Sequence, residues 1–406
     1  MTNDGGISVG YVGVHAAYQV ALAAEEMGRL DRFYCSLLDA PGKWGGLLYT
    51  VLGSKRLASR RVPGLPPERV IENPWPFLRS SVRAALRQSR SDEWLRTCDA
   101  FDRWMAVQLE RSESRVFYGG EVSSEHSFRV AKARGMTCLL DCSHVHPLFL
   151  KSILDPDTKP TASKAPFTSF ALRKLRTYAL ADFLVTQSDI QTRSFVESGC
   201  PATKIIQNPR GVNLSLFAPA PRPTGAADGS PLKALFAGRV TLLKGIPWLW
   251  EAMRNCGAQV NLTLVGPLSA DGKALLSQAP SNTSYLPPVS KSALASVYRS
   301  HDVLIMPSLI EPFGNVGLEA MACGLPVILT DHCGTPVPDE SWRVPVRNGA
   351  AIAERLLRYA DDRELLARDQ LRAAQFAPTY SQAAFRARIA ARFQALLDAP
   401  AGSSTP

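Results

Sequence analysis

The sequence predicts an α/β protein with two parallel-sheet domains, each sheet covered by helices. Short buried strands alternate with helices in the first half, and the same alternation restarts after a stretch rich in Pro, Ala and Gly. The chain has 406 residues, which suits two ordinary domains better than one. Hydrophobic residues make up 46% and charged residues 20%, a composition typical of globular proteins with large cores.

The first half begins with a predicted strand at Ile7–Val12, followed by a helix from His15 that ends at Gly28. The alternation continues along this half in segments that we list in chain order: a strand at 116–118, a helix at 124–134, and strands at 137–142, 181–186 and 205–206. Strands that alternate with helices are typical of a parallel sheet covered on both faces.

The second half repeats this pattern after the aperiodic stretch 218–231. Its predicted elements are, in chain order, strands at 233–236, 260–265, 303–306 and 327–330 and helices at 246–255, 293–299 and 316–322. The chain then ends with an amphipathic helix, Ser381–Leu397, whose apolar stripe consists of Phe385, Ile389, Phe393 and Leu396. We therefore predict a first domain at 1–215, a linker at 216–231, a second domain at 232–380 and a terminal helix at 381–398.

The net charge of +10 includes two clusters of basic residues in the first half: Lys55, Arg56, Arg60 and Arg61, then Arg79, Arg83, Arg87 and Arg90. The spacing of the second cluster places it on one face of a single helix. This face either contacts an anionic lipid or a phosphorylated acceptor, or it is simply exposed to solvent. The clusters lack interleaved aromatic residues, which argues against nucleic acid.

Two features predict a cytoplasmic protein, which the arginine face would at most hold against the inner surface of the membrane. The N-terminus lacks a basic stretch followed by an apolar run, and no apolar run approaches the roughly 20 residues of a membrane span. The eight cysteines form no Cys-x-x-Cys pair, which favours buried, reduced thiols over disulfides or a zinc site.

The stretch from Pro307 to Val327 carries the clearest chemistry. A strand ends near Met306, a glycine-containing loop follows, and a helix begins near Asn315. The free N–H groups of a helix N-terminus favour phosphate. Glu311 precedes this N-terminus and Glu319 lies within the helix. Carboxylates accept hydrogen bonds from hydroxyls, so one can hold a sugar and the other a ribose.

This stretch resembles the family 4 glycosyltransferases, through the Glu-x7-Glu spacing of Glu311 and Glu319. The segment 236–245 is similar to that family's Gly-Arg…Lys-Gly segment, and 264–266 and 295–303 match as well. The likeness covers the second domain closely and the first domain loosely. It implies the GT-B fold, in which two Rossmann-like domains face each other across a cleft and the C-terminal helix returns to the first domain.

The resemblance also implies residue roles. Arg239 and Lys244 would neutralise the donor diphosphate, Glu311 would bind the donor sugar, and Glu319 the ribose. The remaining residues implied at the nucleotide sugar are Gly13, Gly238, Gly266, Phe313, Gly314, Asn315 and Val316. Gly13 stands where the family often carries paired glycines.

His144 is the first-domain residue expected at the donor sugar, with His146 as the alternative. Both follow a predicted strand, at the sheet edge where ligands bind open parallel sheets, and the resemblance places a histidine there. The basic segment Arg173–Arg176 is similar to a helix that borders the acceptor site, where it either binds an acceptor phosphate or is solvated. Asp155 and Asp157 have the spacing of a metal motif, but they lie beside Pro156 in a polar stretch, so we expect no metal.

The resemblance implies a retaining, metal-independent glycosyltransferase of polysaccharide, glycolipid or glycoconjugate synthesis. It implies a UDP- or GDP-sugar as co-substrate, no further cofactor, and a hydroxyl acceptor that is a saccharide, lipid-linked or phosphorylated. Two alternatives stay open: a nucleotide-sugar epimerase or hydrolase of the same fold, and a non-catalytic nucleotide-sugar-binding partner.

Overall fold

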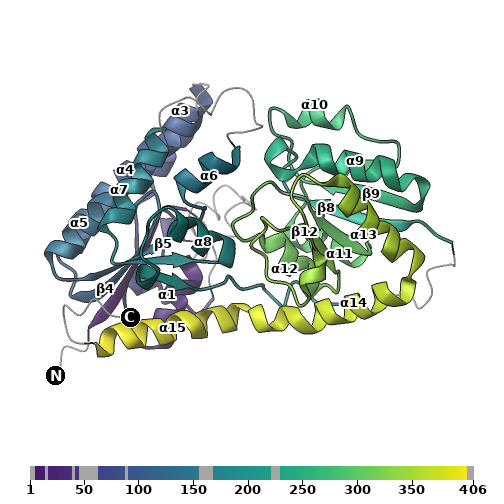
Figure 1. Cartoon of the computed structure of the whole chain (residues 1–406). Helices are drawn as coiled ribbons and strands as arrows, with labels where there is room; N and C mark the ends of the chain where they lie inside the picture. Colours follow the sequence, from purple (N-terminus) through teal and green to yellow (C-terminus); the bar gives the residue numbers. More distant parts are fainter. Residues whose placement is uncertain are drawn as a thin grey trace. The chain divides into compact units, whose positions relative to one another are not determined.

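A computed structural model of the chain describes residues 5–13, 17–38, 42–44, 63–86, 90–154, 168–220 and 229–399. These residues form two compact units (Figure 1). The first comprises residues up to Thr186 together with Phe195–Asn208 and the chain from Phe385 on, and the second comprises Gln187–Ser194 and Pro209–Ala384. Each unit contains one sheet in which every pair of neighbouring strands is parallel. The predicted fold class is therefore confirmed.

The sheet of the first unit has seven strands in the order β3-β2-β1-β4-β5-β6-β7. In chain order they are β1 (Gly6–Tyr11), β2 (Leu30–Cys35), β3 (Val70–Glu72), β4 (Ser114–Gly120), β5 (Thr137–Asp141), β6 (Phe183–Thr186) and β7 (Ile205–Gln207). The helices of this half are α1 (Ala17–Glu26), α3 (Trp75–Leu86), α4 (Arg90–Leu109), α5 (Glu125–Ala133), α6 (Pro147–Leu154), α7 (Ser169–Leu180) and α8 (Asp189–Glu197).

The strands of this sheet are buried on both faces. Successive residues of a strand point to opposite faces, and in β4 Val116 and Tyr118 join one apolar cluster while Phe117 joins the other. Helix α1 contributes to the first cluster and α4, α5 and α7 to the second. The two-sided burial explains the continuous apolar runs from which the strands were predicted.

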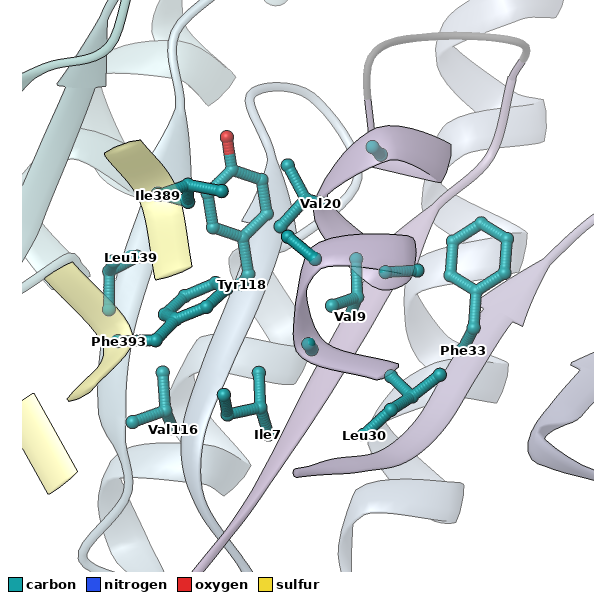
Figure 2. Close-up of a cluster of buried hydrophobic side chains, with 14 of the residues drawn as sticks. Ile7, Val9, Val20, Leu30, Phe33, Val116, Tyr118, Leu139, Ile389 and Phe393 are labelled. Carbon is teal, nitrogen blue, oxygen red and sulfur yellow. The ribbon is translucent and has the colours of Figure 1, made fainter. Parts of the chain in front are cut away.

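The C-terminal helix α15 (Gln382–Asp398) packs into the first of these clusters through Phe385, Ile389, Phe393 and Leu396. The ring of Phe393 meets that of Tyr118 edge-on, with 6.2 Å between centroids. Figure 2 shows Ile389 and Phe393 pointing toward the side chains of β4. The predicted apolar stripe is therefore the buried face of this helix, so the last helix of the chain belongs to the core of the first unit.

The sheet of the second unit has six strands in the order β10-β9-β8-β11-β12-β13. They are β8 (Leu232–Ala237), β9 (Val260–Val265), β10 (Thr283–Leu286), β11 (Val303–Met306), β12 (Val327–Thr330) and β13 (Arg343–Val344). The helices are α9 (Ile246–Cys256), α10 (Gly272–Leu276), α11 (Lys291–Arg299), α12 (Asn315–Ala322), α13 (Gly349–Asp361) and α14 (Arg363–Phe376). The 3-10 turns of the chain are Pro67–Arg69, Ala202–Lys204, Leu242–Lys244, Gly257–Gln259, Glu340–Trp342 and Ala377–Tyr380.

Helices cover both faces of this second sheet as well. Trp250 of α9 and Tyr359 of α13 are buried in the cluster on one face, and Tyr298 of α11 and Leu318 of α12 in the cluster on the other. The predicted strands at 260–265, 303–306 and 327–330 coincide with β9, β11 and β12. All eight cysteines are free thiols, as expected. None of the described helices combines the length and hydropathy of a membrane span.

The arginine cluster does not lie on one helix. Arg79 belongs to α3, which ends at Leu86, and Arg90 begins α4, so the expectation of a single helical face was wrong. Arg79 is exposed, whereas the side chains of Arg83 and Arg90, residue Arg87 and the cluster from Lys55 to Arg61 lie outside the described residues. The pair Asp155 and Asp157 lies outside them too.

Candidate active site

In the second sheet the strand order changes direction at β8. From this central strand the chain first adds β9 on one side and later adds β11 on the other. Loops that leave the carboxyl ends of two such strands diverge, and the crevice between them is the usual ligand site of open parallel sheets. Two loops border this crevice: residues 238–245 after β8 and residues 307–314 after β11.

The loop after β8 carries the two predicted cations. Arg239 is exposed, and within the described parts of the chain its guanidinium makes no hydrogen bond or ion pair. Lys244 ends a 3-10 turn, Leu242–Lys244, and precedes Gly245 with φ of 74°. A Cβ on Gly245 would lie 1.8 Å from the carbonyl oxygen of Pro307. Glycine therefore allows this loop to press against the loop after β11.

This close approach brings Lys244 and Glu311 together. The Lys244 ammonium donates to Oε2 of Glu311 in an ion pair, with side chains that are 28% and 16% exposed. The backbone of Glu311 is fixed by hydrogen bonds to the loop after β12, 3.0 Å to the carbonyl oxygen of His332 and 2.8 Å from the N–H of Gly334. Two residues that the sequence separates by 67 positions thus form one charged pair at the crevice.

The N-terminus of α12 follows directly. Gly314 occupies the N-cap position with φ of 78°, and no side chain caps the helix. A Cβ on Gly314 would lie 2.6 Å from Oγ1 of Thr335, and that hydroxyl donates to the carbonyl oxygens of Phe313 at 2.6 Å and Gly314 at 3.1 Å. Phe313 is buried, while Asn315 is exposed and Val316 half-buried. The loop therefore presents uncapped N–H groups beside Lys244, a suitable arrangement for an anion.

Glu319 lies further along α12 with partners of its own. The Lys291 ammonium donates to its Oε1, and the Tyr298 hydroxyl donates to its Oε2 at 3.3 Å. Burial and the nearby carboxylate raise the pKa of Tyr298 well above its ordinary value, so this hydroxyl stays protonated as a donor. Sequence reasoning did not identify Lys291, because 28 residues separate it from Glu319.

The remaining predicted glycines differ in what the structure requires of them. A Cβ on Gly266 would lie 2.0 Å from the carbonyl oxygen of Gly238, so the turns after β9 and β8 touch through their backbones. A Cβ on Gly13 would meet the Tyr11 ring at 3.4 Å, an ordinary contact. Packing therefore explains Gly266 but gives no steric reason for glycine at 13.

In the first unit the sheet reverses at β1, between β2 and β4. Glu121 directly follows β4 and is buried. His144 follows the neighbouring strand β5, and its side chain is 57% exposed. Nδ1 of His144 lies 3.1 Å from Oε2 of Glu121 and 2.8 Å from Oγ of Ser143. The predicted histidine is thus tied by one nitrogen to a buried carboxylate.

Glu121 is the centre of a compact network that sequence analysis missed. Its Oε2 accepts from Oγ of Ser143 at 2.8 Å and pairs with Nζ of Lys174 at 3.0 Å, and its Oε1 accepts from the Tyr178 hydroxyl. Burial opposes the ionised form, but the Lys174 ammonium and the hydrogen bonds from His144 and Tyr178 outweigh burial and lower the pKa of Glu121. The available signal was a carboxylate placed directly after a buried strand.

His146 occupies a different environment. It is buried, with its ring 5.5 Å from that of Tyr178 and 5.4 Å from that of Phe195. Burial lowers the pKa of His146, which favours a neutral ring in the core. Of the two candidate histidines, His144 is the one exposed at the sheet edge.

The basic segment Arg173–Arg176 is engaged with carboxylates inside the first unit. Arg173 pairs with Asp102 at 2.7 Å and also contacts Asp99, and Arg176 pairs with Glu125 at 2.9 Å. Lys174 pairs with Glu121. These ion pairs give the segment a structural role on α7. Among the described residues, no cluster of His, Cys, Asp and Glu has the arrangement of a metal site.

Much of the second unit matches a known protein family. Residues 231–362 match the family described as Glycosyl transferases group 1. A D-inositol 3-phosphate glycosyltransferase from Arthrobacter is 42% identical over 137 residues, 30% of this chain and 32% of the relative. One from Nocardia farcinica is 33% identical over 229 residues, 50% of this chain and 51% of the relative. The chain thus spans about a third to a half of the curated relatives it matches.

Solved structures match over nearly the whole chain. Sucrose-phosphate synthase from Thermosynechococcus elongatus superposes with a TM-score of 0.69 at 19% identity, over 98% of this chain and 100% of the other. HepE from Anabaena, solved in complex with UDP-glucose, has a TM-score of 0.61 at 16% identity, over 96% and 100%. The solved structures and the two parallel sheets show that the chain has the GT-B fold, and the match of residues 231–362 and the relatives support a family 4 glycosyltransferase.

Proposed function

We propose that the protein transfers a sugar from a nucleotide-diphosphate donor to a hydroxyl acceptor, with retention of the anomeric configuration. The observation that carries this proposal is the Lys244–Glu311 pair beside the uncapped N-terminus of α12, at the reversal point of the second sheet. The pair lies within the segment that matches the glycosyl transferases. UDP-glucose in the structure of the similar HepE makes a UDP-sugar the first donor to test.

The pair suggests how the donor is held. A bound diphosphate would compete with Glu311 for the Lys244 ammonium, because both are anions and the helix N-terminus adds a favourable dipole. Once Lys244 turns to the diphosphate, both oxygens of Glu311 can accept hydrogen bonds from the hydroxyls of the donor sugar. Glu319, fixed by Lys291 and Tyr298, is the proposed acceptor for the ribose hydroxyls.

The proposed chemistry needs no side chain as a nucleophile. Lys244, the exposed Arg239 and the α12 dipole would stabilise the diphosphate as the bond from its oxygen to the anomeric carbon breaks. The departing diphosphate oxygen would take the proton from the incoming hydroxyl, which then bonds to the same face of the sugar. His144 would contact the donor sugar, and neither a metal nor a further cofactor takes part.

A pocket in the first unit favours an acceptor that carries an anionic group or a ring. This pocket, about 320 Å³ in volume, lies between α3 and α4 and is lined by residues that include Trp75, Arg79 and Arg96. Trp75 is an exposed indole, and the two guanidinium groups favour phosphate or carboxylate. We propose that a saccharide, lipid-linked or phosphorylated acceptor binds here. Flotation with anionic vesicles tests the lipid-linked case.

A thermal-shift screen against UDP- and GDP-sugars tests the donor, because a ligand that binds the folded state raises its melting temperature. Each sugar nucleotide that binds is then incubated alone and with glycoside or polyol acceptors. A new glycoside formed only with acceptor, with its anomeric configuration read by NMR, is the expected result. Free sugar or an epimer formed without acceptor would instead establish a hydrolase or epimerase, and binding without turnover a non-catalytic protein.

A further inference from the structure

A buried threonine lies beside the N-terminus of α12. Thr335, in the loop after β12, is fully buried. Its hydroxyl donates to the carbonyl oxygens of Phe313 at 2.6 Å and Gly314 at 3.1 Å. A hydroxyl has one proton, so the two carbonyl oxygens share it, and Phe313 is the closer acceptor. Thr335 thus fixes the two peptide groups that lead into the helix.

Fixing these two carbonyl groups also fixes two N–H groups. A peptide group is planar and trans, so its C=O and its N–H point in opposite directions. The carbonyl of Phe313 belongs to the same peptide group as the N–H of Gly314, and the carbonyl of Gly314 to that of Asn315. Both N–H groups therefore point away from Thr335. Neither has a hydrogen-bond partner among the residues that the structure describes.

The backbone conformation at Gly314 brings the two N–H groups together. Gly314 is left-handed, with φ of 78° and ψ of 68°, and Asn315 begins the right-handed helix α12. A left-handed residue next to a right-handed one makes successive N–H groups converge on a concavity that binds anions. The dipole of α12 adds to the positive potential at this point. The two N–H groups therefore suit an oxygen of a phosphate group.

The loop that carries Thr335 is itself held in place. The Arg343 guanidinium donates to the carbonyl oxygens of Cys333 at 2.7 Å and Thr335 at 3.0 Å. Thr335 also fills the space beside two glycines of the neighbouring segment. A Cβ on Gly314 would lie 2.6 Å from its Oγ1, and a Cβ on Gly317 would lie 2.7 Å from its Cγ2. The methyl group of Thr335 therefore packs against α12, while the hydroxyl orients the backbone that precedes this helix.

We propose that Thr335 is a positioning residue that aims the N–H groups of Gly314 and Asn315 at an oxygen of the donor diphosphate. Because the two peptide groups are held before the ligand arrives, binding requires no rearrangement of this backbone. The diphosphate part of this inference rests on the proposed function, whereas the orientation of the peptide groups does not.

NMR spectroscopy of the full chain tests the orientation of the two peptide groups. The sequence contains Phe-Gly and Gly-Asn only once each, at 313–314 and 314–315, so a ¹³C-carbonyl label on the first residue and a ¹⁵N label on the second isolate one signal for each. A hydrogen bond to a carbonyl oxygen moves the ¹³C signal downfield. Both signals should therefore move upfield in Thr335→Val, which lacks the hydroxyl, and stay in Thr335→Ser. Unchanged signals in Thr335→Val would overturn the proposal.

Titration with inorganic pyrophosphate tests the binding role. In the wild type the amide signals of Gly314 and Asn315 should move as pyrophosphate binds. Thr335→Val should weaken this binding about tenfold or more, the usual value of a hydrogen bond to a charged group. Thr335→Ser should bind as the wild type does, although its missing methyl group lowers the melting temperature. Equal weakening in Thr335→Ser would show that Thr335 acts by packing and would contradict the proposal.

The wild-type titration alone can also overturn the binding role, even if Thr335→Val does not fold. Amide signals of Gly314 and Asn315 that ignore saturating pyrophosphate would be that result.

Thr330→Val is the matched control. Thr330 is buried at the end of β12, and its hydroxyl also donates at 2.6 Å to a backbone carbonyl oxygen, that of Ser308 in the loop after β11. This bond does not involve the two peptide groups before α12. The control should therefore lower the melting temperature and keep the affinity for pyrophosphate. A loss of affinity equal to that of Thr335→Val would mean that any loosening of these loops weakens binding, which contradicts a specific role for Thr335.

The positioning role and the proposed function fail in different ways. Pyrophosphate binding that depends on the Thr335 hydroxyl, without sugar transfer from any donor, would remove the proposed function and leave the positioning role. Transfer at the wild-type rate by Thr335→Val would remove the positioning role alone. If both hold, Thr335→Val should lose about tenfold or more in kcat/KM for sugar transfer, and Thr335→Ser should not.

Discussion

The two sheets of the protein end in contrasting edges. At the edge of the first sheet the charges are buried and paired: Glu121 with Lys174, and Asp102 with Arg173. At the edge of the second sheet Arg239 is exposed and the Lys244–Glu311 pair is partly open to solvent. Buried pairs are costly to break and fix the geometry, whereas accessible charges can exchange partners. The first edge is built to orient a side chain, and the second to bind an ion.

Neutralising Glu121 should have the largest effect on stability. Glu121→Gln leaves the Lys174 ammonium buried without a counter-ion, which costs about 3–5 kcal/mol. Urea unfolding at neutral pH measures this loss. Glu340→Gln, at an exposed carboxylate that pairs with the half-buried Arg343, should cost less than about 1 kcal/mol. Equal small losses in both variants would show that the first edge is no more tightly built than the surface.

The lowered pKa of Glu121 predicts that the free energy of unfolding depends on pH. The folded pKa of this carboxylate lies below its ordinary value of 4.5, so its contribution to stability is complete above that pH and is lost as the pH falls toward the folded pKa. The free energy of unfolding of the wild type should therefore decrease below about pH 4.5. In the Glu121→Met/Lys174→Met variant this decrease should be smaller, as acid titration monitored by circular dichroism would show.

Removing the Lys244 ammonium at the edge of the second sheet should chiefly affect catalysis. Lys244→Ala is expected to lower kcat/KM for sugar transfer by about 100- to 1,000-fold, the usual loss when a group that stabilises developing charge is removed. Steady-state assays measure it, and circular dichroism checks that the fold persists. Lys273→Ala, at an exposed lysine of α10 in the same unit, should retain full activity. Full activity in Lys244→Ala would refute the proposed site.

Two glycine substitutions test how closely the loops after β8 and β11 approach each other. Gly245→Ala meets both a left-handed φ of 74° and the Pro307 carbonyl oxygen, and should cost about 3 kcal/mol. Gly135→Ala has the same φ of 74° with open space around it, so only the backbone conformation costs, about 1 kcal/mol. Thermal unfolding measures both. Equal losses would mean that the contact between the loops after β8 and β11 is not tight.

The smallest effect is expected at the half-exposed pair of Arg176 and Glu125. Arg176→Ala should change the free energy of unfolding by less than about 1 kcal/mol, because the pair is screened by solvent and Glu125 keeps Arg129 as a partner. Chemical denaturation at low and high salt measures this change. A loss comparable to that of Glu121→Gln would erase the distinction between buried and exposed pairs.

Hydrophobic periodicity was sufficient to predict β8, β9, β11 and β12 of the second unit, because β11 and β12 are wholly apolar and buried and the apolar residues of β8 and β9 are buried. It missed β10, whose residues are only partly buried, and the two-residue β13. It also missed β2, whose segment Leu30–Cys35 includes Asp31 and Arg32. Asp31 is tolerated there because the hydroxyls of Ser112 and Ser114 each donate to it at 2.9 Å. That compensation comes from a segment about 80 residues away and leaves no local pattern.

The residues of the candidate site also fall into two groups, those that the local sequence could predict and those that only the fold brings together. Glu311, Gly314 and Glu319 lie within one short stretch, so their spacing in the sequence was enough to indicate a site for phosphate and hydroxyl groups. The Glu121–Lys174 and Lys291–Glu319 pairs join residues 53 and 28 positions apart, and only the sheet order brings them together. For the same reason the exposed His144 and the buried His146 could not be distinguished from their sequence neighbours alone.

Calorimetric titration of the full chain with a nucleoside diphosphate tests the central claim most directly, namely that Lys244, Arg239 and the α12 N-terminus bind a diphosphate. UDP or GDP should bind the wild type at least about tenfold more tightly than the corresponding monophosphate, because the second phosphate adds charge-assisted hydrogen bonds at this site. Lys244→Ala should abolish that preference and Lys273→Ala should keep it. Binding that ignores the second phosphate, or a preference that survives Lys244→Ala, would contradict the account.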